Sequence, residues 1–118
     1  MPAATADELA AIVSRLEQIL DPYRDRLEQA TIYNIPTLRR RGATAHHWFA
    51  FVKPASKHVG FYLLPMHEHP ELRNTLSPSL AKRVTGKSVF TFPTADEPLF
   101  TELEAVVARA FDAYMADG

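Results

Sequence analysis

Two pairs of histidines flank a pair of strand-like runs in the middle of the chain. They are His46, His47, His67 and His69, with Glu68 between the last two. If the two runs form a hairpin, the start of the first run lies beside the end of the second, and these side chains gather at one end of a sheet. Imidazole and carboxylate groups suit zinc or iron, so the four histidines are a candidate metal site. The alternative is that they are ordinary solvated loop side chains, because no fixed spacing such as His-Glu-x-x-His is present.

The strand-like runs themselves combine aromatic and basic side chains. Residues 46–53 (HHWFAFVK) and 57–64 (KHVGFYLL) have the spacing of a β-hairpin, and residues 87–92 (KSVFTF) predict a further strand. Alternation places Phe49 and Phe51 on one face, and Trp48, Ala50 and Val52 on the other. Because both faces are apolar, one face can meet helices while the other is partly exposed.

The partly exposed face predicts a binding site for a small anionic molecule. Trp48 and Tyr62 would form aromatic walls, and the polar or basic groups would be Arg39, Lys57, His58 and Lys87. We expect residues 65–86 to fold over this face and enclose the site. The alternative is that this loop only completes a second small core.

Signatures of covalent and nucleotide chemistry are missing from the sequence. There is no cysteine and no G-x-S-x-G motif, and Gly86-Lys87-Ser88 has Ala81 where a phosphate-binding loop needs glycine. We therefore expect a binding domain rather than an enzyme. A nucleic-acid-binding module is a further alternative, because three consecutive arginines at 39–41 lie near aromatic residues, although a solvated strand edge explains the same run.

Helices are predicted at both ends of this strand region. Apolar residues recur at spacings of three and four over residues 9–20 and 99–114, which is typical of helices with one buried face. The first 30 residues are expected to be helical throughout. Residues 31–40 favour a strand, interrupted by Pro36.

This order predicts a single α+β domain over residues 1–118. We expect a two-layer sandwich in which the N- and C-terminal helices pack on one face of an antiparallel sheet of four or five strands. The predicted core comprises Leu16, Ile19, Phe49, Phe51, Phe61, Leu103, Val107 and Phe111.

Charge and composition limit the partners. The 118 residues carry 13 basic and 14 acidic side chains, a net charge of −1, so nucleic acid is an unlikely partner for the whole chain. Both ends are acidic and residues 31–93 are basic, so we expect a domain with two oppositely charged sides. With no apolar run long enough to span a membrane and no leader-like start, we expect a cytoplasmic protein, monomeric or weakly homodimeric.

Three segments resemble the YdhG-like family of bacterial domains of unknown function. They are residues 33–37 (YNIPT), 57–62 (KHVGFY) and 86–92 (GKSVFTF), within a similarity that extends over about residues 5–115. Asn34 and Ile35 depart from the glycine and methionine usual in the family. The resemblance implies a frataxin-like sandwich, and some members are labelled iron chaperones. It implies no catalytic residues, and it makes iron or zinc handling the main alternative function.

Overall fold

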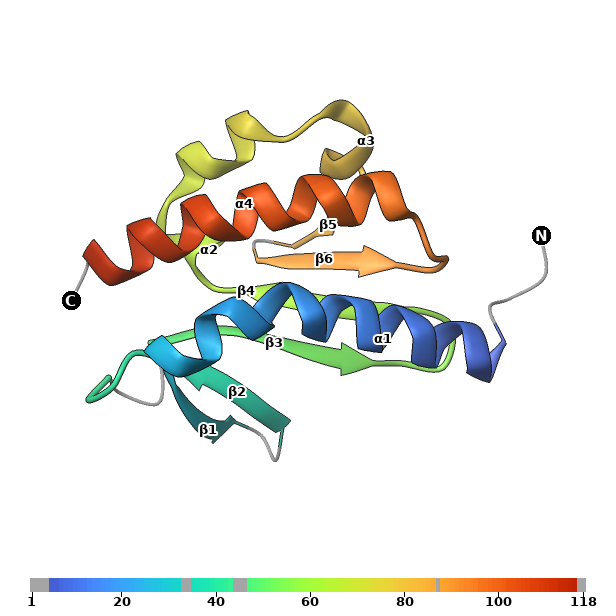
Figure 1. Ribbon diagram of the computed structural model, residues 1–118. Coiled ribbons are helices and arrows are strands. Elements are labelled where there is room, and N and C mark those ends of the chain that lie inside the picture. Colours follow the sequence, from blue (N-terminus) through green and yellow to red (C-terminus); the bar gives the residue numbers. More distant parts are fainter. Residues whose placement is uncertain (1–4, 33–34, 44–46, 87, 117–118) are drawn as a thin grey trace.

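The computed structural model describes residues 5–32, 35–43, 47–86 and 88–116, and shows two long helices lying side by side against a sheet (Figure 1). In chain order the elements are α1 (Ala6–Leu20), the 3-10 helix η1 (Asp21–Arg26), β1 (Glu28–Ile32), β2 (Ile35–Arg39), β3 (Trp48–Pro54), β4 (Val59–Leu63), α2 (Pro65–Glu68), the 3-10 helix η2 (Pro70–Thr75), α3 (Pro78–Ala81), β5 (Val84–Thr85), β6 (Val89–Phe92) and α4 (Glu97–Ala116).

The sheet is antiparallel throughout, with the strand order β1-β2-β3-β4-β6-β5. This confirms the predicted α+β class and the β3–β4 hairpin, but the sheet has six strands rather than four or five. One additional strand is β5, whose two residues are too few to give an alternating pattern.

The other additional strand is β1, and it corrects the expectation that the first 30 residues are helical throughout. The 3-10 helix ends at Arg26, and β1 begins at Glu28. Its residues Glu-Gln-Ala have little intrinsic strand preference, so pairing along the whole of β2 overrides local propensity. The predicted strand also divides into two, because β1 ends at Ile32 and β2 begins at Ile35. Pro36 lies within β2, before the Leu38 and Arg39 positions that pair with β3.

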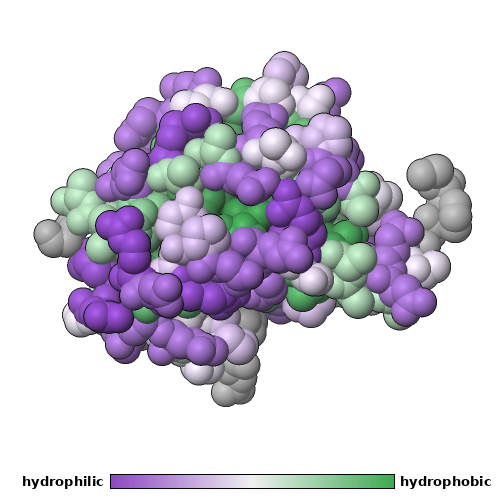
Figure 2. Space-filling model, in the orientation of Figure 1, coloured by the Kyte–Doolittle hydropathy of each residue, from purple (hydrophilic) through white to green (hydrophobic). Residues whose placement is uncertain are grey.

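Helices α1 and α4 cover one face of the sheet and enclose the core between the layers. The predicted residues Leu16, Ile19, Phe49, Phe61, Leu103, Val107 and Phe111 all belong to this core. Buried Ile12, Leu16 and Ile19 follow the helical spacing of α1. In the orientation of Figure 1 the surface is largely hydrophilic with scattered apolar groups (Figure 2).

A β-bulge in β3 changes which of its side chains reach the core. Leu38 pairs with Ala50 and the next residue, Arg39, pairs with Trp48, so Phe49 is an extra residue on β3. Phe49 consequently contacts Phe111 on the helical side, with ring centroids 5.6 Å apart. The expected grouping of Phe49 with Phe51 is therefore wrong: Phe51 is buried but lies on the face away from the helices, together with Trp48.

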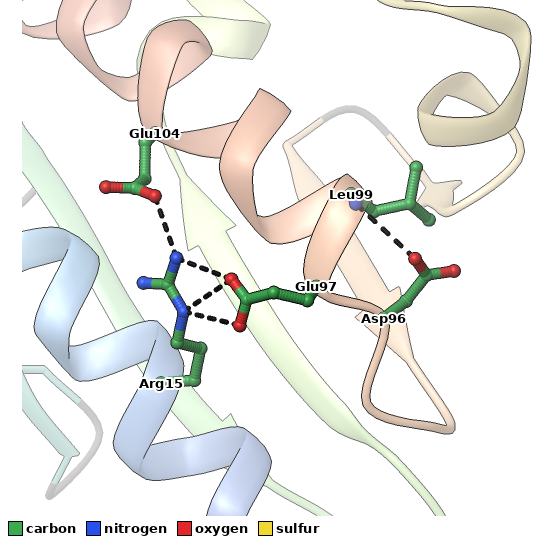
Figure 3. Close-up of polar contacts among 5 residues, drawn as sticks. All are labelled: Arg15, Asp96, Glu97, Leu99 and Glu104. Atoms are coloured by element: carbon green, nitrogen blue, oxygen red, sulfur yellow. Dashed lines mark hydrogen bonds and ion pairs between the residues drawn. The ribbon is translucent and has the colours of Figure 1, made fainter.

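Charged side chains join the two long helices at their exposed margin (Figure 3). Nη2 of Arg15 on α1 lies 2.8 Å from a carboxylate oxygen of Glu97 and 2.8 Å from one of Glu104, both on α4. Hydrogen bonds from Arg15 hold the pKa of Glu97 below its ordinary value. The cluster therefore fixes the position of α4 along α1.

Residues 65–86 do not fold over the open face of the sheet, contrary to the sequence-based expectation. Residues 65–81 run along α4 on the side away from α1 (Figure 1), where Met66, Leu72 and Leu80 enter the main core, and Val84–Thr85 then join the edge of the sheet as β5. Ser77 fixes the segment to α4, because its backbone N–H and its hydroxyl donate to the Glu102 carboxylate at 2.7 and 2.6 Å.

Candidate functional site

The sheet face away from α1 and α4 is left open, because the helices of the described chain pack on the other face. Cross-strand pairing places Phe51 opposite Tyr62, and Tyr62 opposite Val89. It also places Gly60 between Lys53 and Thr91. We call this surface the open face, and define it by Trp48, Phe51, Lys53, Gly60, Tyr62, Val89 and Thr91.

Three aromatic rings form a row across β3 and β4 on the open face. The rings of Trp48 and Phe51 have centroids 4.9 Å apart, and those of Phe51 and Tyr62 are stacked at 4.5 Å with planes only 10° apart. Phe51 is 6% exposed because its neighbours cover it, whereas Trp48 and Tyr62 are half-buried. Trp48 and Tyr62 are therefore partly exposed to solvent, and Phe51 packs between them.

Beside Tyr62, the missing side chain of Gly60 leaves a hollow in the open face. The hollow has a volume of about 210 Å³ and is lined by Lys53, Ala55, His58, Gly60, Tyr62, Thr85, Val89 and Thr91. A Cβ at residue 60 would lie 2.9 Å from Cε1 of Tyr62, closer than side chains normally pack. Glycine is therefore needed both for the hollow and for the position of the Tyr62 ring. We call this site the Gly60 hollow.

The Gly60 hollow is electrostatically suited to an anion. No carboxylate is among its lining residues. The exposed Lys53 makes no ion pair with any residue in the described part of the chain. The hydroxyls of Thr85 and Thr91 lie 2.8 Å apart and hydrogen-bond to one another, so either can turn to a ligand. An ammonium with two hydroxyls beside an aromatic wall is a common composition for binding carboxylates or phosphates.

The structure brings several of the predicted ligand-binding residues to this side of the sheet. Tyr62 and His58 line the hollow itself. Trp48 lies on the open face, but Phe51 separates it from Tyr62, so it is not a wall of the hollow. Arg39 pairs with Trp48 in the sheet, where its guanidinium bonds to Glu28 at 3.0 Å. Lys57 lies exposed before β4, and Lys87 falls outside the described residues.

Sequence reasoning missed Lys53, Thr85 and Thr91. Their common feature is their position around Gly60, which only the strand register reveals. A glycine inside a strand pattern, between Val59 and Phe61, was the available signal, because such a glycine often marks a close approach of a ligand or another group.

Of the residues predicted to form a metal site, the structure brings His47 beside Glu68. Nε2 of His47 lies 3.1 Å from Oε1 of Glu68, and His69 lies 3.3 Å from Glu71. His67 is exposed and lines a separate hollow with Arg73, while His46 falls outside the described residues. Among the residues that the structure describes, no three histidine, aspartate or glutamate side chains are placed to hold a metal ion.

His47 also has a structural neighbour, Tyr114 on α4. Their rings have centroids 4.8 Å apart. The Tyr114 hydroxyl donates to the His47 carbonyl at 2.6 Å and accepts from the Arg40 backbone N–H at 2.8 Å. Burial of the phenol raises the pKa of Tyr114 above its ordinary value. This cluster connects the end of α4 to the segment that precedes β3.

The three arginines at 39–41 do not form one basic surface. Arg39 bonds to Glu28, and Arg40 lies over the Tyr114 ring at 5.5 Å. Arg41 donates to the Asp25 carbonyl at 3.3 Å. Each guanidinium thus has an intramolecular partner.

Comparison of the chain with protein-family models, curated proteins and solved structures finds no match. No helix within the described ranges is long and apolar enough to cross a membrane. The geometry of the open face is therefore the main basis for a functional proposal.

Proposed function

We propose that this protein is a non-catalytic binding domain that holds a small anionic molecule in the Gly60 hollow. The observation that carries the proposal is the Lys53 ammonium, which lies without an acidic partner among the described residues, at the rim of a hollow that no carboxylate lines. An unpaired cation beside two hydroxyls favours a carboxylate or a phosphate group.

The polar groups around the hollow support binding rather than catalysis. A hydroxyl nucleophile is normally activated by a base within hydrogen-bond reach. Here the hydroxyls of Thr85 and Thr91 bond to each other, and the His58 imidazole makes no hydrogen bond to another described residue. The arrangement supplies donors and an aromatic wall without an activated nucleophile.

The wider assignment is also part of the proposal. The order of helix, antiparallel sheet and helix supports a frataxin-like arrangement and the resemblance to YdhG-like domains. We further propose a cytoplasmic protein that is a monomer or a weak homodimer. Iron or zinc handling ranks below anion binding, because within the described residues His47 and Glu68 are joined by no third ligand group.

Titration with inorganic phosphate and with acetate, followed by amide chemical shifts, tests the proposal. We expect shifts to concentrate at residues 53, 58–62 and 85–91, and binding to weaken as salt is added. Lys53→Gln should weaken binding about tenfold, since a charge-assisted hydrogen bond is lost. Lys82→Gln is the matched control, because Lys82 is also exposed but lies outside the hollow. Equal effects of the two substitutions, or no shifts around Gly60, would overturn the proposal.

A further inference from the structure

The chemical class of the ligand can be narrowed from the shape of the same hollow. We propose that the Gly60 hollow binds a single-ring aromatic carboxylate, with its ring against Tyr62 and its carboxylate at Lys53. This inference rests on the proposed function and specifies that the anionic ligand contains one aromatic ring.

The Tyr62 side chain provides the surface for a planar ring. Phe51 stacks on one side of the Tyr62 ring and does not line the hollow, so the other side of that ring is turned toward it. The Phe51 stack and the close approach to Gly60 also hold the Tyr62 ring in one orientation. Val89, opposite Tyr62 on β6, adds an apolar contact. A fixed aromatic surface with one free side favours a stacked or edge-on ring over a flexible aliphatic chain.

The volume of the hollow matches a ligand with one ring. A cavity of about 150 Å³ accommodates a benzene ring, and a water molecule takes about 30 Å³ in the liquid. The Gly60 hollow, at about 210 Å³, therefore holds one six-membered ring together with a group of about the size of a carboxylate. A two-ring system would extend beyond it.

The polar groups lie where the acid group of such a ligand would reach them. Lys53 and Thr91 flank Gly60 on its two neighbouring strands, and Tyr62 is two residues further along β4. The Tyr62 ring leans back toward Gly60, since its Cε1 would lie 2.9 Å from a Cβ at residue 60. A ligand ring against Tyr62 therefore lies beside the strand positions of Lys53 and Thr91, where an attached carboxylate can reach the ammonium and the hydroxyl.

A series of four small probes separates the contribution of the ring from that of the charge. Benzoate carries both, cyclohexanecarboxylate carries the charge on a non-planar ring, acetate carries the charge alone, and benzamide carries the ring without a charge. We expect benzoate to bind about fivefold more tightly than cyclohexanecarboxylate, from the additional affinity of an aromatic pair. Acetate and benzamide should both bind more weakly than benzoate.

Two substitutions at Tyr62 make the test specific to the ring. Tyr62→Leu should remove the preference for benzoate over cyclohexanecarboxylate, whereas Tyr62→Phe should keep it. Cyclohexanecarboxylate binding as tightly as benzoate in the unsubstituted protein would overturn the aromatic inference. If Lys53→Gln still weakens both carboxylates, the proposed anion-binding function survives that result. Benzamide binding as tightly as benzoate, or no effect of Lys53→Gln, would instead refute the anion-binding function itself.

Discussion

Substitution of Tyr114 by phenylalanine should destabilise the protein through the loss of one buried hydroxyl. Tyr114 is 0% exposed, and its hydroxyl makes two hydrogen bonds, to the His47 carbonyl at 2.6 Å and from the Arg40 N–H at 2.8 Å. Phenylalanine keeps the ring and its packing against Phe49, so the cavity left is very small. What is lost is the partner of two backbone groups on the segment between β2 and β3.

The expected loss in the free energy of unfolding is about 2 kcal/mol, at about 1 kcal/mol for each hydrogen bond. For a domain of this length, such a loss lowers the melting temperature by about 8 °C. Urea unfolding followed by far-UV circular dichroism measures the change. The slope of the unfolding free energy against urea concentration should be unaltered, because the surface exposed on unfolding stays the same.

Tyr62→Phe is the matched control for this prediction. The Tyr62 hydroxyl makes no hydrogen bond to any residue within the described ranges, and its side chain is half-buried. We expect its removal to change stability by less than about 0.5 kcal/mol. If Tyr114→Phe were as stable as Tyr62→Phe, the hydroxyl could not be what attaches the end of α4 to the β2–β3 connection.

Three further predictions concern ionisable side chains of α4, namely Glu97, Tyr114 and Glu102. Arg15→Gln should raise the pKa of Glu97 toward its ordinary value of about 4.3, and carboxyl NMR titration measures it. Because folding lowers the pKa of Glu97, the ion pair with Arg15 stabilises the protein above about pH 4.3, and this stabilisation is lost as the pH falls. An unchanged pKa of Glu97 in Arg15→Gln would contradict the Arg15–Glu97 ion pair. Burial raises the pKa of Tyr114, so its contribution is present below about pH 10 and is lost as the pH rises further. Above about pH 10, the ordinary tyrosine pKa, the free energy of unfolding should therefore fall less steeply in Tyr114→Phe than in the unsubstituted protein. Equal slopes of stability against pH in the two proteins would refute this. Glu102→Ala should cost about 2 kcal/mol by removing two charge-assisted hydrogen bonds to Ser77. Amide exchange at residues 77–82 should become faster in that variant, and unchanged exchange would show that the segment is held by other contacts.

The layer arrangement could be predicted from the sequence because it depends on periodicity. Two patterns are local properties of the chain. One is the helical spacing of apolar residues, such as Leu16 in α1 and Leu103 in α4, and the other is the hairpin spacing of β3 and β4. The start of β1 could not be predicted, since Glu28, Gln29 and Ala30 have little strand preference and their pairing with β2 is what forms the strand there.

The site was partly predictable for a related reason. Tyr62 and His58 could be found from residue type and alternation. Lys53, Thr85 and Thr91 depend on which residues pair across three strands, and that register is not visible in any one segment. The position of residues 65–86 also depends on competition between two apolar surfaces, α4 and the open face, which the sequence pattern does not rank.

The extra residue at Phe49 has a consequence for how this gene can change in length. Upstream of the bulge, β3 presents Trp48 to the open face, and downstream it presents Phe51 to the same face, although the two positions are three apart. Deleting the codon for Phe49 would leave Trp48 and Phe51 two positions apart, so simple alternation would keep both rings on the open face. The loss would fall on the helical side, where Phe49 contacts Phe111. The bulge therefore gives the core one more aromatic side chain than an unbroken β3 would supply, and a one-codon deletion at this position should weaken the packing of the helices rather than rearrange the open face.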